Sequence, residues 1–155
     1  MNPLNKCWVL PDLHLTLRPD DKDLPWVLDE AIAYRDGTGR LHTVPARYLT
    51  DLASIPGFLP LVIDRHKAKR SAVLHDWHYS EAPPGITRKI ADDLFFESML
   101  SGGVKRIFAA AYWCAVRFGG WHSWNKYRKS SKRQWKDETP NVDTPTPADV
   151  RPVPR

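Results

Sequence analysis

The chain has little cysteine and no long hydrophobic run, and each absence excludes a class of protein. Cys7 and Cys114 are its only two cysteines. Two cysteines are too few for a disulfide scaffold, and their separation excludes a zinc site built from Cys-x-x-Cys pairs. No run of about 18 apolar residues occurs, so no transmembrane helix is expected. The first residues also lack the charged start and apolar run that are typical of a signal peptide.

The composition indicates one globular domain with a basic surface. Hydrophobic residues make up 42% of the 155 positions, which is enough for a buried core. The formal net charge is +5, and such a charge favours acidic partners such as phosphate groups, nucleic acid or anionic lipid.

Residues 1–56 are rich in predicted strands. Apolar residues alternate with polar ones, and turn-forming residues separate these stretches. The glycine-containing turn at 35–39 predicts a hairpin between the two longer strands. The predicted strands are 6–10, 13–17, 26–34 and 40–44.

Residues 64–120 have helical periodicity and predict three helices. Asp64 is a candidate N-cap for a helix that runs to about Tyr79, and Thr87 for a second helix that ends at Gly102. The third helix is predicted over 104–119. The expected fold is therefore α+β, with N-terminal antiparallel strands or a hairpin packed beside a three-helix unit, in a single domain over 1–120.

The C-terminal part changes character twice. Residues 121–136 combine three tryptophans and a tyrosine with basic side chains, which suits stacking on nucleic-acid bases. The same mixture suits the surface of an anionic bilayer. A third interpretation is a solvated helix that docks its tryptophans on the domain. Residues 137–155 contain five prolines and few apolar residues, which predicts a disordered tail.

A histidine and an aspartate on two successive predicted helices form the main candidate site. His75 and Tyr79 lie four residues apart on one helix face, and Asp92 lies on the apolar face of the next helix. Packing of these faces brings Asp92 towards His75. A carboxylate that accepts from one imidazole nitrogen leaves the other nitrogen to take a proton from water. The alternative is a structural hydrogen-bond network without chemistry.

Two further aspartates are candidates for a cation site. Asp76 follows His75 directly, and Asp51 lies in a loop before the histidine helix. Loop carboxylates and carbonyls are what a hard cation such as calcium needs. The alternative for Asp51 is a capping or turn role. His78 lies off the helix face of His75, and His42 has no carboxylate or cysteine at ligand spacing, so we expect both at the surface.

The order and spacing of these motifs resemble those of DUF1353, an uncharacterised domain family common in bacteriophages and prophages. The usual family forms are T-D-F-A-S-I-P, L-H-D-x-L-Y, A-D-x-x-F and A-V-R. The corresponding stretches here are Thr50-Asp51-Leu52-Ala-Ser54, His75-Asp76-x-x-Tyr79, Asp92-x-x-Phe95-x-x-x-Met99 and Tyr112-x-x-Ala115-Val116-Arg117.

The same motifs are similar to those of the secreted prokaryotic phospholipases A2. The resemblance implies that His75 is a general base oriented by Asp92 and that Tyr79 supports the carboxylate. It implies a Ca²⁺ site made by the side chains of Asp51 and Asp76 and the carbonyl of Leu52. The implied reaction is calcium-assisted attack of water on a lipid ester. The chain departs from these lipases because it has no cysteine shortly before the histidine.

The resemblances lead to two hypotheses for function. The first is a phage-encoded, phospholipase A2-like hydrolase that acts on anionic membrane lipid during entry or lysis. The second is a non-enzymatic virion, tail or assembly protein whose partners are neighbouring phage virion subunits. The basic, aromatic segment by itself suggests a third hypothesis, a nucleic-acid binder built on residues 121–136. The expected location is the host cytoplasm or the virion.

Overall fold

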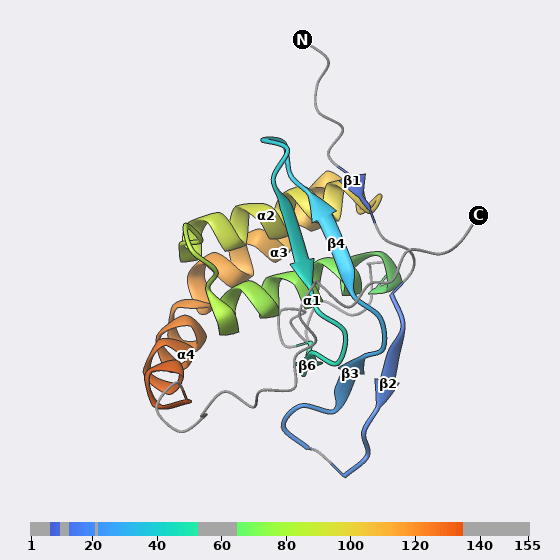
Figure 1. The fold of residues 1–155 in the computed structure, drawn as a ribbon. Coiled ribbons are helices and arrows are strands. Elements are labelled where there is room, and N and C mark those ends of the chain that lie inside the picture. Colours follow the sequence, from blue (N-terminus) through green and yellow to red (C-terminus); the bar gives the residue numbers. More distant parts are fainter. Residues whose placement is uncertain (1–6, 10–12, 21, 53–64, 135–155) are drawn as a thin grey trace, which may run out of the picture.

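Short strands form the N-terminal part of the structure and four helices form the C-terminal part (Figure 1). The computed structural model describes residues 7–9, 13–20, 22–52 and 65–134. The predicted α+β class is confirmed. The strands are β1 (Cys7–Trp8), β2 (Leu15–Leu17), β3 (Trp26–Leu28), β4 (Ile32–Arg35), β5 (Leu41–Val44) and β6 (Leu49–Thr50). The helices are α1 (Arg65–Glu81), α2 (Arg88–Ser101), α3 (Arg106–Gly119) and α4 (Trp121–Gln134).

The strands form two small antiparallel sheets, with strand orders β1-β4-β5 and β2-β3-β6. The predicted hairpin is the β4–β5 pair, in which Ile32 lies opposite Val44 and Arg35 opposite Leu41. Its turn is closed by Asp36, whose carboxylate accepts from the backbone N–H groups of Thr38 and Arg40. This arrangement is how an aspartate stabilises a tight turn through its own neighbouring backbone.

The prediction of one long strand over 26–34 is wrong. The chain leaves regular structure after Leu28, so that β3 belongs to one sheet and β4 to the other. The break falls at Asp29 and Glu30, which are both exposed, and the Asp29 N–H donates to the carbonyl of His14. Two adjacent charged residues interrupt the alternation that a continuous half-buried strand needs.

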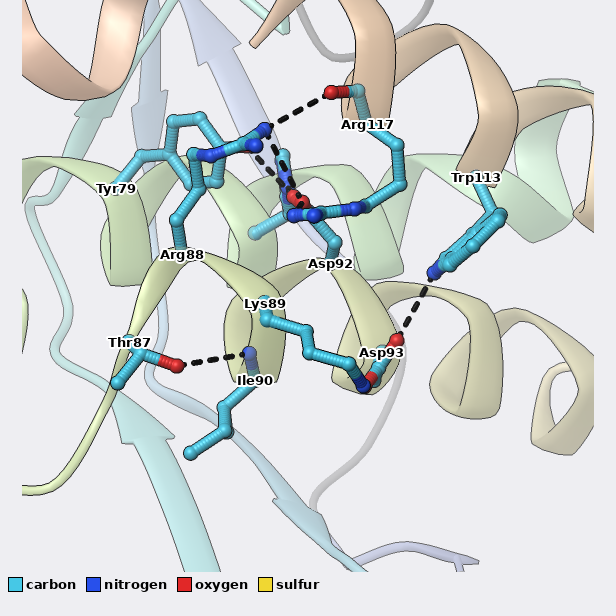
Figure 2. Close-up of polar contacts among 10 residues, drawn as sticks. Tyr79, Thr87, Arg88, Lys89, Ile90, Asp92, Asp93, Trp113 and Arg117 are labelled. Carbon is cyan, nitrogen blue, oxygen red and sulfur yellow. Dashed lines mark hydrogen bonds and ion pairs between the residues drawn. The ribbon is translucent and has the colours of Figure 1, made fainter. Parts of the chain in front are cut away.

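The helix boundaries follow the predicted caps closely. Thr87 is the N-cap of α2, and its side chain accepts from the N–H of Ile90, as Figure 2 shows. The helix α2 ends where predicted, at Gly102. The helix α3 begins two residues later than expected, at Arg106, and Asp64 lies outside the described residues.

The helix α1 packs against the strands with one side and against α2 and α3 with another. Val73 and Leu74 belong to a core cluster shared with the strands. Ala68 and Ala72 belong to a second cluster shared with the later helices, which contains Phe95. Because alanine side chains are small, these two positions allow neighbouring helices to approach closely. Burial of a side chain as large as Phe95 contributes roughly 1.5–3 kcal/mol.

The basic, aromatic segment after residue 120 forms α4, which packs against α1. The Trp124 ring meets the Tyr79 ring edge-on, with 5.1 Å between their centroids. The guanidinium of Arg128 lies 4.5 Å from the Trp124 ring centroid and donates to the backbone carbonyls of Tyr79 and Ser80. Of the three interpretations of this segment, a helix that docks a tryptophan on the domain matches these contacts. The division of the chain at residue 120 stays a prediction, and residues 135–155 lie outside the described part.

Within the described part of the chain, none of the four helices is both long and apolar enough to cross a bilayer.

A close approach of α1 to the α3–α4 corner generates a stability prediction. A Cβ atom on Gly120 would lie 2.5 Å from the Tyr79 hydroxyl and 2.5 Å from the Val116 carbonyl oxygen, whereas a Cβ on Gly119 would meet nothing within 4 Å. Because the φ of Gly120 is −72°, its backbone is accessible to any residue, and the obstacle is steric. We expect Gly120→Ala to lower the free energy of unfolding by about 1–3 kcal/mol, measured by urea denaturation.

The matched control is Gly119→Ala, which we expect to change stability by less than about 1 kcal/mol, in the stabilising direction. Equal effects of the two substitutions would contradict the tight corner.

Candidate functional site

Two residues of α1, His75 and Tyr79, form the centre of the candidate site. They lie one helical turn apart, and their rings are 4.2 Å apart between centroids. The Phe95 ring of α2 also packs on the His75 ring, with 4.7 Å between the centroids. His75 is only 2% exposed. Close packing by two aromatic rings therefore fixes the orientation of the imidazole.

The structure brings Asp92 of α2 against both residues, as the sequence predicted. His75 Nε2 lies 2.9 Å from Asp92 Oδ1. The Tyr79 hydroxyl donates to the same oxygen at 2.6 Å. Asp92 is fully buried, so these two hydrogen bonds replace part of the water that an ionised carboxylate needs.

Two arginines complete the surroundings of Asp92, and sequence reasoning assigned neither of them a role. Arg117 of α3 donates to Asp92 Oδ2 at 2.7 Å, and an Arg88 nitrogen lies 3.6 Å from the same oxygen. Figure 2 shows both guanidinium groups directed at this carboxylate. Arg88 also donates to the backbone carbonyl of Arg117. The i,i+4 spacing of Arg88 and Asp92 could have predicted their ion pair from the sequence, whereas the contact of Arg117 with Asp92 depends on helix packing.

The electrostatics keep Asp92 ionised. Burial alone would raise its pKa, but hydrogen bonds from His75, Tyr79 and Arg117 outweigh burial and hold the pKa below its ordinary value of 3.8. Burial and the hydrogen bond to Asp92 raise the pKa of Tyr79, so its hydroxyl stays a proton donor. The hydrogen bond to Asp92 also raises the pKa of Arg117. The centre is thus a carboxylate with fixed charge surrounded by fixed donors.

A cavity of about 300 Å³ adjoins this centre. His75 and Tyr79 line it together with Asp51 and Asp76, so the cavity collects four of the six predicted site residues. Residues of the α3–α4 corner and of α4 complete the lining: Ala115, Val116, Gly119, Gly120, Ser123, Lys126 and Tyr127. The histidine, two carboxylates and a lysine therefore meet at one hollow.

Of the predicted cation ligands, Asp51 and Leu52 directly follow β6, and Asp76 lies on α1. Asp76 accepts a hydrogen bond from the Thr50 hydroxyl at 2.6 Å, and Thr50 in turn accepts from the N–H of Leu52 at 3.0 Å. Leu52 has a φ of 56°, an unusual backbone for a bulky residue. Its side chain packs on the core. This left-handed backbone position follows Asp51, which is exposed at the cavity.

The donor set of these residues suits a hard cation such as calcium. Two carboxylates line one cavity, and calcium accepts carboxylate, backbone carbonyl and water oxygens in flexible geometry. Among the described residues, no group of three or more His, Cys, Asp or Glu side chains is arranged to hold a metal. Asp51 and Asp76 would therefore need backbone carbonyls, such as that of Leu52, and water to complete a calcium shell.

The expectation that His42 and His78 lie at the surface is wrong. Both are buried, and His42 Nδ1 lies 3.1 Å from His78 Nε2. His42 Nε2 lies 2.9 Å from Asp36 Oδ2. Burial, together with the neighbouring His42, lowers the pKa of His78 to about 3. These residues link the hairpin to α1. His42 lies two residues before Val44 on β5 and therefore on the same face, and this spacing was the signal in the sequence for an inward-facing ring.

The surroundings of Asp92 generate a prediction for stability and its pH dependence. Asp92→Asn removes the charge that Arg117 and Arg88 neutralise, and loss of one partner from a buried pair costs about 3–5 kcal/mol. The folded-state pKa lies below the unfolded value, so the contribution of Asp92 is present above about pH 4 and is lost as the pH falls through the folded pKa. We expect the stability difference between wild type and variant to shrink at low pH, measured by urea denaturation.

The adjacent Asp93 provides the matched control. Its side chain is 43% exposed and pairs with Lys89, so Asp93→Asn should cost less than about 1 kcal/mol. A similar loss in both variants, or a loss in Asp92→Asn that does not depend on pH, would contradict the assigned charge of Asp92.

Comparison with known proteins places the chain in one family. The model of the family described as "Protein of unknown function (DUF1353)" matches residues 26–116. No curated protein and no solved structure was found that matches the chain. The matched span runs from the start of β3 into α3, and it includes His75, Asp92 and both candidate cation ligands, Asp51 and Asp76. The chain therefore belongs to the DUF1353 family.

Proposed function

We propose that the protein is a phage-encoded hydrolase of membrane-lipid esters with a mechanism similar to that of phospholipase A2, acting during entry or lysis. The observation that carries the proposal is the buried His75–Asp92 pair at 2.9 Å, beside a cavity that two further carboxylates line. A base, its orienting carboxylate and candidate cation ligands are the parts that metal-assisted hydrolysis needs.

Asp92 gives His75 the tautomer that a general base requires. When Asp92 Oδ1 accepts from Nε2–H, the lone pair of the neutral ring is on Nδ1. Nδ1 is then the atom that takes a proton from the attacking water. As the ring becomes an imidazolium, the negative charge of Asp92 stabilises it at a fixed distance.

The arginines and Tyr79 act on the base through Asp92. Tyr79 donates to the oxygen that also accepts from His75, and with His75 and Arg117 it holds the pKa of Asp92 low. Arg88 adds an ion pair to the same carboxylate. These donors prevent Asp92 from turning away from the imidazole. They are positioning residues, because they act on His75 through their contacts with Asp92.

Calcium is the cation that the proposal assigns to the cavity. Asp51 and Asp76 would hold it, with the carbonyl of Leu52. When bound, calcium would polarise the ester carbonyl and stabilise the negative charge that develops on its oxygen. The Thr50 hydroxyl bond orients the Asp76 carboxylate independently of any ion.

A second candidate is a non-enzymatic phage virion, tail or assembly protein. The observation that favours it is that Asp92 joins α1, α2 and α3 through His75, Tyr79, Arg88 and Arg117. A buried carboxylate with four partners on three helices is also what a purely structural centre would contain. In that case the partners of the protein are neighbouring virion subunits.

Release of fatty acid from phosphatidylglycerol vesicles tests the first candidate against the second. We expect release by the wild type in millimolar calcium and none with EDTA. His75→Gln should lower the rate by about 10²–10⁴-fold, because general-base catalysis contributes that much. Asp76→Asn should abolish both the calcium-dependent rate and calcium binding, which titration calorimetry measures directly.

The control variant is His122→Gln, because His122 is exposed and does not line the cavity. It should keep the wild-type rate, and circular dichroism should show every variant folded. If folded wild-type protein releases fatty acid no faster than His75→Gln and binds no calcium, the hydrolase is excluded and the structural candidate is favoured.

A further inference from the structure

The outward face of α3 is apolar along its whole length. Ile107, Ala111, Cys114 and Phe118 follow one another at intervals of four, three and four residues, which places them on one side of the helix. All four are exposed, Ile107 by 74% and Phe118 by 82%. The next exposed aromatic residue, Trp121, begins α4 and is 57% exposed. These five residues are called the α3 face below.

Unlike an ordinary surface helix, α3 is apolar on its exposed side as well as on its buried side. A helix at the edge of a domain normally buries its apolar side and turns charged residues to water. Here the inner side is already filled, because Ala109, Tyr112 and Val116 of α3 are buried against the core. Exposed apolar stripes of this kind mark sites of interaction with a partner.

The charged residues of α3 and α4 themselves are all basic. From residue 102 to residue 134 the sequence contains eight Lys or Arg residues and neither Asp nor Glu. Among these, Lys105, Lys126 and Lys129 are exposed. The partner must therefore offer both an apolar phase and negative charge.

We infer that the α3 face docks on an anionic lipid bilayer. Aromatic side chains insert at the level of the headgroups, aliphatic ones reach the acyl boundary, and lysines attract anionic headgroups. The inference deepens the proposed function and rests on it, because it names the surface through which the same cavity reaches its substrate.

The α3 face adjoins the candidate site. Phe118 and Trp121 flank Gly119 and Gly120, which line the cavity, and Lys126 on the next helix lines it as well. A bilayer bound at this corner therefore lies beside the cavity that contains His75. A lipid would pass from the membrane to the site without crossing bulk water.

Two other partners fit the α3 face less well. A second copy of the chain would bring two sets of cations together across the interface, with no acidic residue between 102 and 134 to pair with them. A nucleic acid would match the charge, but it offers no apolar phase for Ile107 and Ala111, and neither side chain can stack on a base.

Vesicle flotation in EDTA tests the inference without any hydrolysis. We expect the protein to bind vesicles of phosphatidylglycerol and phosphatidylcholine at least about tenfold more tightly than phosphatidylcholine alone, and less tightly as salt rises. Ile107→Glu and Phe118→Glu should each weaken binding to the anionic vesicles by about tenfold or more. The matched control is Leu41→Glu, since Leu41 is a 47% exposed apolar residue on the hairpin and should not affect binding.

Several outcomes would overturn the inference. The first is vesicle binding that neither α3 substitution weakens. The second is a wild-type dimer, seen by analytical ultracentrifugation, that Ile107→Glu dissociates. The third is binding to single-stranded DNA, weakened by Phe118→Glu, without binding to vesicles. Vesicle binding that these substitutions weaken, in a protein that releases no fatty acid in calcium, would support the docking surface and refute the hydrolase.

Discussion

The burial of one ionised carboxylate, that of Asp92, is the constraint on which the rest of the structure depends. Its free energy cost in an apolar interior is high unless donors surround it. The fold supplies them from three helices: His75 and Tyr79 from α1, Arg88 from α2 itself, and Arg117 from α3. The relative placement of these helices is therefore set by polar geometry as well as by the apolar clusters between them, and a shift of any one helix would weaken the donor set that compensates the buried charge.

The same constraint gives the proposed site its chemistry. A carboxylate whose pKa is held low by the hydrogen bonds around it stays an acceptor, and it fixes which nitrogen of His75 carries the proton. The cavity beside the pair is bordered by Asp51 after β6, by α1 and by the α3–α4 corner. That corner approaches α1 so closely that Gly120 has no room for a Cβ. Beyond that corner the surface is apolar and basic. The proposed base, the cavity and the proposed docking surface thus follow one another in space, although their residues come from separate elements.

Local signals in the sequence predicted helices α1 to α3 and the hairpin, because each depends on short-range rules. The His75–Asp92 contact was predicted from the packing of the apolar faces of two successive helices. Caps such as Thr87 and the four-residue spacing of His75 and Tyr79 can be read directly from the chain. The errors involved long-range packing. Charged residues at 29 and 30 divided one predicted strand between two sheets, His42 and His78 proved buried against each other, and the contact of Arg117 with Asp92 joins positions 25 residues apart. No periodicity specifies which side of α1 meets the hairpin and which meets α3.

The protonation state of His75 tests the central claim most directly, because the account requires Asp92 to select one tautomer. Long-range ¹H–¹⁵N correlation spectra separate the ring nitrogens of the six histidines, and His75→Gln identifies the signals of His75. The account predicts that the neutral form of the ring has its proton on Nε2 and none on Nδ1. A proton on Nδ1 instead would contradict it, because Nε2 would then donate nothing to Asp92 and Nδ1 would have no lone pair with which to accept a proton from water.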